Sequence, residues 1–356
     1  MLIARAPLRI SLAGGGTDLP AYYEQFGGSV VSTTIDKFVY VHVGPNHTNG
    51  VQITSADYRT FYRRRLGASA GWDGELALPR AVVDEMEIDE GITLFLASEV
   101  SPGTGLGSSS ALAVALIQAI AVWQGRLLSR QTVAELACRV ELQKLQAPIG
   151  KQDQFAAAFG GLNAISFTRS GVTVEPIRVS PSTREQLERR LMLFFTGTAR
   201  NSAVILKEQQ RASAARSPQT IGGLHRIKAA AADCRVCLES GDLDGIGHLL
   251  DEGWREKRKL VEGITNQRID EVYDVARAAG AVGGKITGAG GGGFLLLYCH
   301  EVYQEGLTEE MEKLGLRRMD FGFDRRGVSS QHVSWTSGAR VDGITMEPEV
   351  TEIALT

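Results

Sequence analysis

Glycine makes up 41 of the 356 residues, and it is concentrated in three short segments of the chain, 14–16, 103–107 and 288–293. Glycine lets the backbone take positive φ angles and approach a ligand or another backbone closely. Three such segments, far apart in the sequence, indicate that the fold brings them together for a shared purpose. We therefore expect the fold to be organised around them.

The middle segment predicts an anion-binding site. Residues 102–111 read Pro-Gly-Thr-Gly-Leu-Gly-Ser-Ser-Ser-Ala and lead into an apolar segment at 111–123 that is typical of a buried helix. A glycine turn before a helix presents free N–H groups, and the helix dipole favours negative charge there. An ordinary N-cap needs only one serine, so three serines favour an anion. The candidate phosphate-binding residues are Gly103, Gly105, Leu106, Gly107, Ser108, Ser109 and Ser110.

Two large nucleotide-binding classes do not match this segment. A P-loop requires lysine after its last glycine, whereas Gly107 is followed by Ser108. A dinucleotide fingerprint requires glycine where Ser108 stands and an acidic residue about twenty positions later. The chain there reads Trp-Gln-Gly at 123–125, so a dehydrogenase is excluded.

Charge and composition exclude further classes. The formal net charge of -3 gives no basic field for nucleic acid. No apolar stretch is long enough to cross a bilayer, and the N-terminal residues read as a strand and not as a signal peptide. Four cysteines are sparse usage that fits a reducing compartment. We expect a cytoplasmic protein with no nucleic-acid or membrane partner.

The order of strand and helix patterns is irregular, which indicates an α+β architecture and not a doubly wound sheet. Strands are expected at 2–13 (with one face buried), 29–44, 92–97, 162–179 (a hairpin), 191–195, 285–287, 294–299, 317–323 and 328–335. Helices are expected at 111–123, 130–146, 201–216, 219–240, 242–262, 266–279 and 302–314. The polar stretch 180–190 marks a crossing between two domains, 1–182 and 183–340. The tail 341–356 has no clear period.

The three glycine segments together resemble motifs of the GHMP kinases, which include galactokinase, homoserine kinase, mevalonate kinase and phosphomevalonate kinase. The motifs are APLRISLAGGGTD at 6–18, PGTGLGSSSA at 102–111 and KITGAGGGG at 285–293. The resemblance covers roughly 1–335 and implies two α+β domains with the active site in the cleft between them. It also implies ATP and Mg²⁺ as cofactors, with the second motif around the ATP phosphates and the third lining the cleft from the other domain.

The resemblance assigns roles to individual residues. Ser109 matches the hydroxyl that binds magnesium, and Glu141 matches its carboxylate partner, with Glu135 as the alternative. Asp153 matches the aspartate that accepts or orients the proton of the sugar hydroxyl, and a helix N-cap is the other role open to it. Arg9 matches an active-site arginine that stabilises transferred charge or holds Asp153 ionised. Solvent-exposed surface positions are the alternatives for Glu141 and Arg9.

The sugar-binding part of the predicted site differs from the corresponding motif of galactokinase. Asp18 matches the sugar-binding aspartate, whereas Gly15 and Gly16 stand where galactokinases carry Glu-His. The two glycines open the pocket to a larger sugar or one of different stereochemistry. Gly290 and Gly291 of the third segment are also predicted to face the substrate.

Residues 195–202 and 253–257 resemble segments of the branch that phosphorylates heptose 7-phosphate at its anomeric hydroxyl. A phosphorylated substrate needs additional cations, for which Arg200 and Lys257 are candidates, although a solvent-exposed Arg200 is equally expected. The resemblance implies a kinase that forms D-glycero-D-manno-heptose 1,7-bisphosphate for the nucleotide-activated heptose of bacterial surface polysaccharide. Its partners would be ATP and a small sugar phosphate, and a homodimer is the candidate assembly.

Two alternatives remain open. A kinase for an unphosphorylated sugar, of the L-fucose or galactose type, would share these motifs. A non-catalytic nucleotide-binding regulator on the same fold would be expected to lack the aspartate or a magnesium ligand, but Asp153, Ser109 and Glu141 are all present.

Overall fold

The computed structural model describes residues 1–67, 71, 73–197, 202–338 and 345–353. The strands are β1 (Leu2–Ala13), β2 (Gly28–Pro45), β3 (Gly50–Ser55), β4 (Thr60–Arg65), β5 (Ile92–Ser98), β6 (Leu162–Thr168), β7 (Gly171–Pro176), β8 (Leu191–Phe195), β9 (Ala281–Ile286), β10 (Phe294–Cys299), β11 (Arg317–Met319), β12 (Ser329–Gly338) and β13 (Thr345–Ile353). The helices are α1 (Pro20–Phe26), α2 (Ala77–Glu85), α3 (Ser108–Trp123), α4 (Arg130–Cys138), α5 (Gln152–Phe159), α6 (Pro181–Arg190), α7 (Ser202–Ala214), α8 (Pro218–Ser240), α9 (Leu243–Lys257), α10 (Gln267–Ala278) and α11 (Gln304–Lys313). A π-helical segment, η1 (Arg139–Lys144), and a 3₁₀ turn, η2 (Glu301–Tyr303), complete the list.

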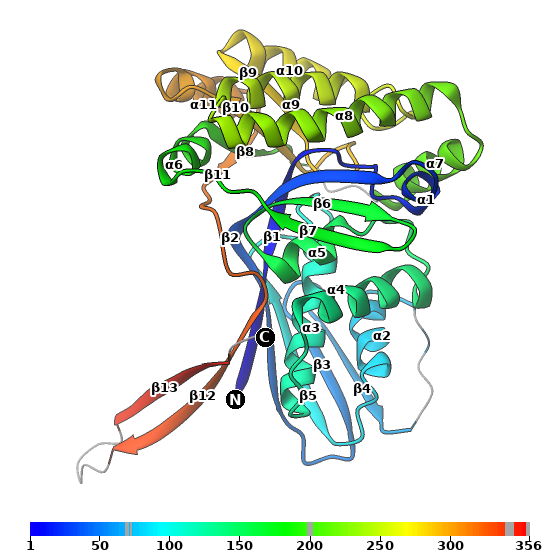
Figure 1. The fold of residues 1–356 in the computed structure, drawn as a ribbon. Helices are drawn as coiled ribbons and strands as arrows, with labels where there is room; N and C mark the ends of the chain where they lie inside the picture. Colours follow the sequence, from blue (N-terminus) through cyan, green and yellow to red (C-terminus); the bar gives the residue numbers. More distant parts are fainter. Residues whose placement is uncertain (68–70, 72, 198–201, 339–344, 354–356) are drawn as a thin grey trace.

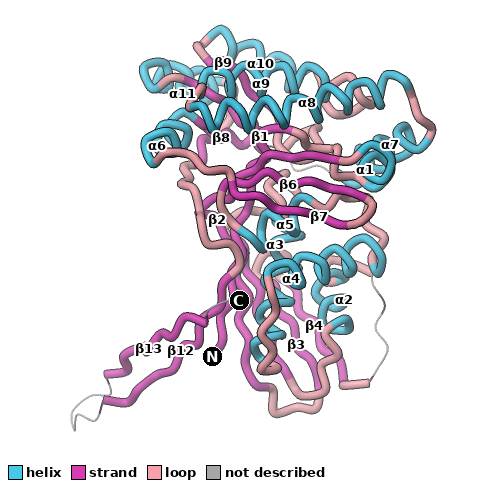
Figure 2. Tube along the Cα trace, in the orientation of Figure 1, coloured by secondary structure: helices cyan, strands magenta, loops and turns pink. Residues whose placement is uncertain are grey.

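The described strands form two sheets (Figure 1). The larger sheet has the order β13-β12-β1-β2-β5-β3-β4, with β6 paired to β2 and β7 paired to β6. The smaller sheet has the order β11-β8-β10-β9. Figure 2 shows α8, α9 and α10 gathered with the smaller sheet at one end of the molecule, while α2, α3 and α4 lie with the larger sheet at the other.

Strand β1 connects the two ends, and its burial differs from the predicted single buried face. Its first residues alternate between buried and half-buried, but every residue from Ala6 to Ala13 is buried. Helices α3 and α5 pack against β1, and so do α8 and α9. The residues expected on a solvent face, Arg9 and Ser11, are therefore enclosed between the two ends of the molecule.

The predicted apolar helix is confirmed as α3, which packs on β1 and β2. Leu116, Ile117 and Ile120 are fully buried. Burial of such a side chain stabilises a fold by about 1.5–3 kcal/mol relative to an exposed position. This helix therefore holds its first turn, Ser108 to Ser110, in a fixed position.

The smaller sheet has its own apolar cluster, in which Trp254, Phe194 and Leu297 are fully buried. Trp254 comes from α9, Phe194 from β8 and Leu297 from β10. This cluster fixes the end of α9, which carries Lys257, against the glycine segment that follows β9.

Several predictions about elements differ from the structure. The stretch 180–190 contains a helix, α6, because Ser180 caps it by accepting a hydrogen bond from the Thr183 N–H. The helix expected at 130–146 ends its α-helical part at Cys138 and continues as the π-helix η1. The tail, in which no periodic pattern was found, contributes β13, which pairs with β12 from Ser330↔Ile353 to Gly338↔Thr345.

The strand expected at 328–335 to close the second domain joins the larger sheet instead. It is part of β12, which pairs antiparallel with β1 from Leu2↔His332 to Arg5↔Ser329. A local pattern of alternating residues cannot show which sheet a strand will join.

The domain boundary at 182/183 stays a prediction. Within the described residues, no helix has the length and apolarity needed to cross a membrane.

Candidate active site

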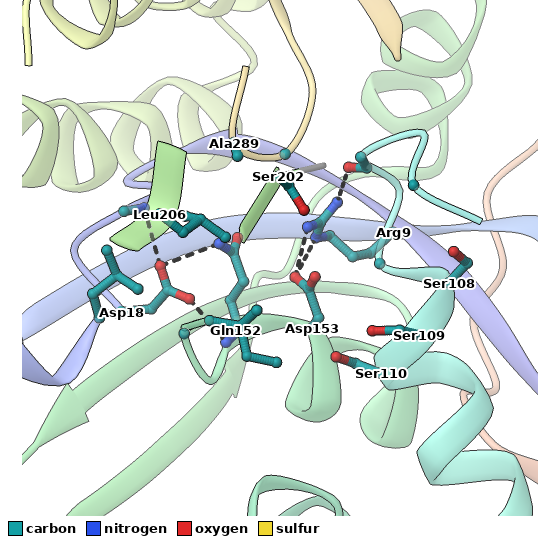
Figure 3. Close-up of a pocket in the computed structure, with 18 of the residues that line it drawn as sticks. Arg9, Asp18, Ser108, Ser109, Ser110, Gln152, Asp153, Ser202, Leu206 and Ala289 are labelled. Carbon is teal, nitrogen blue, oxygen red and sulfur yellow. Dashed lines mark hydrogen bonds and ion pairs between the residues drawn. The ribbon is translucent and has the colours of Figure 1, made fainter. Parts of the chain in front are cut away.

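A cavity of about 240 Å³ lies where the three glycine segments approach one another (Figure 3). Its wall includes a residue of β1, residues of α7 and α9, and the loop that follows β9. The predicted site residues that line it are Arg9, Gly16, Asp18, Gly103, Gly105, Gly107, Ser108, Ser109, Ser110, Asp153 and Lys257. The structure therefore brings together predicted residues that lie far apart in the sequence, from Arg9 to Lys257.

An ion pair between Arg9 and Asp153 lies at the centre of the cavity. The Arg9 Nε donates to Asp153 Oδ1 at 2.7 Å, and Arg9 Nη2 lies 2.6 Å from the same oxygen. The Arg9 Nη1 donates to the Gly105 carbonyl oxygen at 2.7 Å, so the guanidinium also holds the glycine loop. Arg9 is only 3% exposed, which excludes the solvent-exposed alternative. This pair fixes the Asp153 carboxylate in one orientation.

The second glycine segment needs glycine for steric reasons. Gly105 has a φ of +86°, and a Cβ there would lie 2.6 Å from the Thr287 carbonyl oxygen. Gly107, the N-cap of α3, has a φ of +80° and faces the Asp153 carboxyl group. The Thr287 hydroxyl donates to the Thr104 carbonyl oxygen at 3.2 Å. The second and third segments thus pack directly on each other and present the first turn of α3 to the cavity.

A buried carboxylate stands behind this first turn. The Ser109 hydroxyl donates to Glu141 Oε1 at 3.0 Å, and the Gln154 amide donates to Glu141 Oε2 at 2.6 Å. Glu141 is 3% exposed, so it is not a surface residue. Burial raises the pKa of Glu141 to about 7, although hydrogen bonds from Ser110, Gln154 and Ser109 act in the opposite direction. The alternative carboxylate, Glu135, is exposed and bonds Gln131.

Ser109 and Glu141 provide the hard oxygen donors that magnesium prefers. Among the described residues, no group of three or more His, Cys, Asp or Glu side chains could hold a metal ion. A magnesium ion here would therefore depend on phosphate oxygens for much of its coordination. This fits a site that binds the metal together with a nucleotide.

The opposite side of the cavity is built around Asp18, which is 2% exposed. Its carboxylate accepts hydrogen bonds from the Gly16 N–H at 3.0 Å and from the Gln152 backbone and side-chain amides, both at 3.2 Å. Burial raises the pKa of Asp18, and the nearby Asp153 charge adds to this effect. Figure 3 shows Asp153 between the serines of α3 and the Asp18–Gln152 pair.

One face of α7 also lines the cavity, and of its lining residues only Ser202 belongs to a segment that the sequence analysis selected. Ser202, Leu206 and Gln209 are spaced by four and three positions, which places them on the same side of the helix. The Gln209 side chain donates to the Gly16 carbonyl oxygen at 3.4 Å. Gln152 and Gln209 are amides in otherwise ordinary helical segments, so only their positions in the fold identify them.

Several predicted residues lie elsewhere. Gly290 and Gly291 are buried against Ile264, and Gly288 and Ala289 line the cavity in their place. Gly15 is not a lining residue and faces the Ser11 hydroxyl. Leu106 is buried below the loop, where its carbonyl oxygen accepts the Arg9 N–H at 3.0 Å. Arg200 lies outside the described residues.

A second, smaller cavity of about 110 Å³ adjoins the first. The two share Tyr58, Pro102, Ser108 and Ser109. The rest of its wall is mainly apolar and includes Val39, Leu76, Pro79, Leu96 and Leu112. A flat apolar group attached to a phosphate chain could therefore occupy it next to the serines of α3.

Comparison with known proteins agrees with this geometry. Residues 77–161 match the model of the GHMP kinases N-terminal domain, and residues 234–315 match that of the GHMP kinases C-terminal domain. The chain is 30% identical over 335 residues to D-glycero-alpha-D-manno-heptose 7-phosphate kinase of Campylobacter jejuni, a match that covers 92% of this chain and 98% of that protein. The fold is that of a family of kinases, which are phosphotransferases. The chain belongs to the GHMP kinase family.

Two other similarities extend the comparison. The crystal structure of a D-glycero-D-manno-heptose 1-phosphate kinase from Bacteroides thetaiotaomicron superimposes on this structure with a TM-score of 0.78 at 27% sequence identity. The superposition covers 93% of this chain and 98% of the chain in that crystal structure. A bifunctional fucokinase/GDP-fucose pyrophosphorylase of Arabidopsis thaliana is 26% identical over 317 residues, which are 82% of this chain and 29% of that protein. The predicted fold class is confirmed.

Proposed function

We propose that this protein is an ATP-dependent kinase that phosphorylates the anomeric hydroxyl of D-glycero-D-manno-heptose 7-phosphate to give the 1,7-bisphosphate. One observation carries the kinase assignment: the Arg9–Asp153 pair lies in the same cavity as the serine-rich N-terminus of α3. The similarity to the heptose 7-phosphate kinase of C. jejuni supports the substrate. The product would feed the synthesis of nucleotide-activated heptose for surface polysaccharide in the cytoplasm.

The nucleotide would occupy both cavities. Its phosphates would bind the free N–H groups of the Gly103–Ser110 loop and the hydroxyls of the first turn of α3. The adenine would enter the smaller apolar cavity beside Tyr58 and Leu76. Ser109 and Glu141 would hold Mg²⁺, which neutralises phosphate charge when bound.

The sugar would bind on the Asp18 side of Asp153. Asp18 and Gln152 provide acceptors and donors for sugar hydroxyls, and the absence of a side chain at Gly16, which lines the cavity, leaves room for a seven-carbon sugar. The sugar hydroxyl donates a hydrogen bond to Asp153 and gives up its proton as its oxygen bonds to the γ-phosphorus. The bond from that phosphorus to the β–γ bridging oxygen breaks, and ADP leaves with this oxygen.

A panel of acceptors tests the substrate. The enzyme, ATP and Mg²⁺ are incubated with heptose 7-phosphate, unphosphorylated heptose, L-fucose and galactose, and ADP release is measured. We expect the highest kcat/KM with heptose 7-phosphate. Turnover of L-fucose or galactose, without turnover of heptose 7-phosphate, would refute the proposed substrate.

The second candidate is an L-fucose kinase, which the similarity to the Arabidopsis fucokinase favours. The two candidates differ in whether the substrate carries a phosphate. Substitution of Arg200, predicted to bind that phosphate, provides the second test. A raised KM for heptose 7-phosphate alone supports a phosphate contact, whereas an unchanged KM argues against one at this residue.

A further inference from the structure

Lys257 is a buried cation on the wall of the main cavity. It lies in the last turn of α9, is 8% exposed, and belongs to the part of the chain that packs on the smaller sheet. Its Nζ donates to the carbonyl oxygen of Gly288, in the third glycine segment. An ammonium group has three N–H donors. Among the described residues, the Gly288 carbonyl oxygen is the hydrogen-bond acceptor of Lys257. The remaining donors can serve a ligand in the cavity.

Four charged side chains from four other segments interact electrostatically with this ammonium group. They are Arg9 from β1, Asp18 from the loop after β1, Asp153 from the start of α5 and Lys285 from β9. No described carboxylate forms an ion pair with Lys257 within 4.0 Å. Burial lowers the pKa of Lys257 to about 8, because the two carboxylates compensate only partly for burial and for the Arg9 charge. A buried cation without a paired anion is costly, which favours a role in binding an anion that arrives with the substrates.

We propose that Lys257 is a catalytic residue, whose ammonium group contacts the oxygens of the phosphoryl group during its transfer from ATP to the sugar. This inference rests on the kinase function proposed above. The sequence predicted instead that Lys257 anchors the phosphate already present on the substrate. That phosphate is on C7, at the far end of the sugar from the anomeric hydroxyl that faces Asp153. Lys257 bonds the Gly288 carbonyl oxygen, and Gly288 packs on Gly105 of the phosphate loop, so the position of Lys257 corresponds to the reacting end.

The chemistry of the transfer explains why a cation is needed here. As the sugar oxygen bonds to the γ-phosphorus and the bond to the bridging oxygen breaks, negative charge is spread over three equatorial oxygens. The proton of the hydroxyl passes to Asp153 and ADP leaves. Magnesium at Ser109 and Glu141 would act from the side of α3, whereas Lys257 acts from the side of Gly288. A fixed cation in a buried site stabilises such charge without reorganisation.

The third glycine segment has a defined part in this arrangement. A Cβ on Gly288 would lie 2.7 Å from the Gly105 Cα, so the segment that accepts the Lys257 hydrogen bond also packs on the phosphate loop. The position of Lys257 relative to the ATP phosphates is therefore set by backbone contact. This contact links the two ends of the molecule at the reacting centre.

The test compares Lys257→Met and Lys257→Arg with Lys259→Met, an exposed lysine two residues away that pairs with Glu256. The acceptor is whichever sugar the parent enzyme uses, and slow transfer to water is measured without any sugar. We expect Lys257→Met to lower kcat on the order of 100-fold to 1,000-fold with KM for ATP and sugar nearly unchanged. Lys257→Arg should recover part of kcat, and Lys259→Met should match the parent.

The pH profile of kcat/KM provides a readout that a structural role would not change. In the parent enzyme the rate should fall as the pH rises above about 8, because Lys257 loses its charge. In Lys257→Arg this decline should move to higher pH. A Lys257→Met enzyme with unchanged kcat and a raised KM for sugar phosphate would overturn the proposal, and so would an Arg variant with an unshifted profile. Failure of the parent to use heptose 7-phosphate would overturn the substrate assignment alone.

Discussion

At the scale of single residues, the site depends on a carboxylate that is held by an arginine. Arg9 was recognisable from its motif, but the sequence could not show that it contacts both Asp153 and the Gly105 carbonyl oxygen. The helix N-cap role considered for Asp153 does not apply, because the residue lies inside α5, whose N-cap is Lys151. Gln152 and Gln209 could not be predicted, since amides are common on helices and only tertiary packing places these two at the cavity.

The Asp153 carboxylate is the group expected to take the proton of the sugar hydroxyl. Asp153→Asn keeps the volume but removes the charge, so kcat should fall by about 100-fold to 10,000-fold. The Kd for ATP should stay within a few-fold of the parent value, because the phosphate loop does not require the carboxylate. Steady-state kinetics and nucleotide titration measure the two effects. Asp320→Asn, at an exposed position, is the control, and parental kcat in Asp153→Asn would contradict the assigned role.

At the scale of elements, the buried helix α3 and the glycine segments were predictable from composition and period, whereas their contacts were not. The sequence predicted one continuous helix at 130–146. A hydrogen bond in a π-helix spans one residue more than in an α-helix. The spacing of apolar residues, averaged over four or five turns, does not reveal a single turn of this kind. In the structure this turn carries Glu141 to the buried side of Ser109.

Gly105 tests the contact between the second and third segments. Gly105→Ala adds a Cβ 2.6 Å from the Thr287 carbonyl oxygen, at a φ of +86°. We expect a KM for ATP raised at least about tenfold, since a displacement of this size near the chemistry is costly. Gly125→Ala is a matched control, because Gly125 also has a positive φ, +69°, but no atom within 4 Å of the added Cβ. Equal effects of the two substitutions on KM would show that the contact is unimportant.

Glu141 tests the predicted magnesium site. Glu141→Gln retains the size and most hydrogen bonds but removes the charge, so the Mg²⁺ concentration for half-maximal activity should rise about tenfold or more. The activity is measured across a magnesium titration at saturating ATP. Glu135→Gln, on the same stretch of helix but exposed, should titrate as the parent does. A similar shift in both variants would contradict the assignment of Glu141.

At the scale of the whole molecule, the site exists only because β1 and the segment after β9 bring two sheets together. The family resemblance predicted this architecture correctly. It did not predict that β12 returns to β1 or that β13 extends the larger sheet, because strand partners are set by long-range contacts. Lys285 marks the junction, since its Nζ on β9 donates to the Leu12 carbonyl oxygen on β1 at 3.4 Å.

Lys285 predicts how stability depends on pH. It is 8% exposed, and burial together with the Lys257 and Arg9 charges lowers its pKa well below the ordinary 10.5. At pH values between the lowered pKa of Lys285 in the folded protein and 10.5, the unfolded chain binds more protons than the folded one. Stability should therefore rise with pH in that window, by about 1.4 kcal/mol per pH unit for one proton.

Lys285→Met should remove this part of the rise and increase stability at pH 7. Urea unfolding at several pH values between 6 and 10 measures the difference between the parent and the variant. Lys313→Met, at an exposed position, is the control. A difference between parent and Lys285→Met that does not change with pH would show that Lys285 keeps its ordinary proton affinity in the fold.

The proposed reaction is the transfer of the γ-phosphate of ATP to the anomeric oxygen of heptose 7-phosphate. Phosphorus NMR of the enzyme with Mg²⁺, ATP and this sugar tests it most directly. We predict a new signal coupled to the anomeric proton, which grows together with ADP while the 7-phosphate signal persists. The absence of that signal from an enzyme that binds ATP, or its appearance only with L-fucose or galactose, would contradict the account.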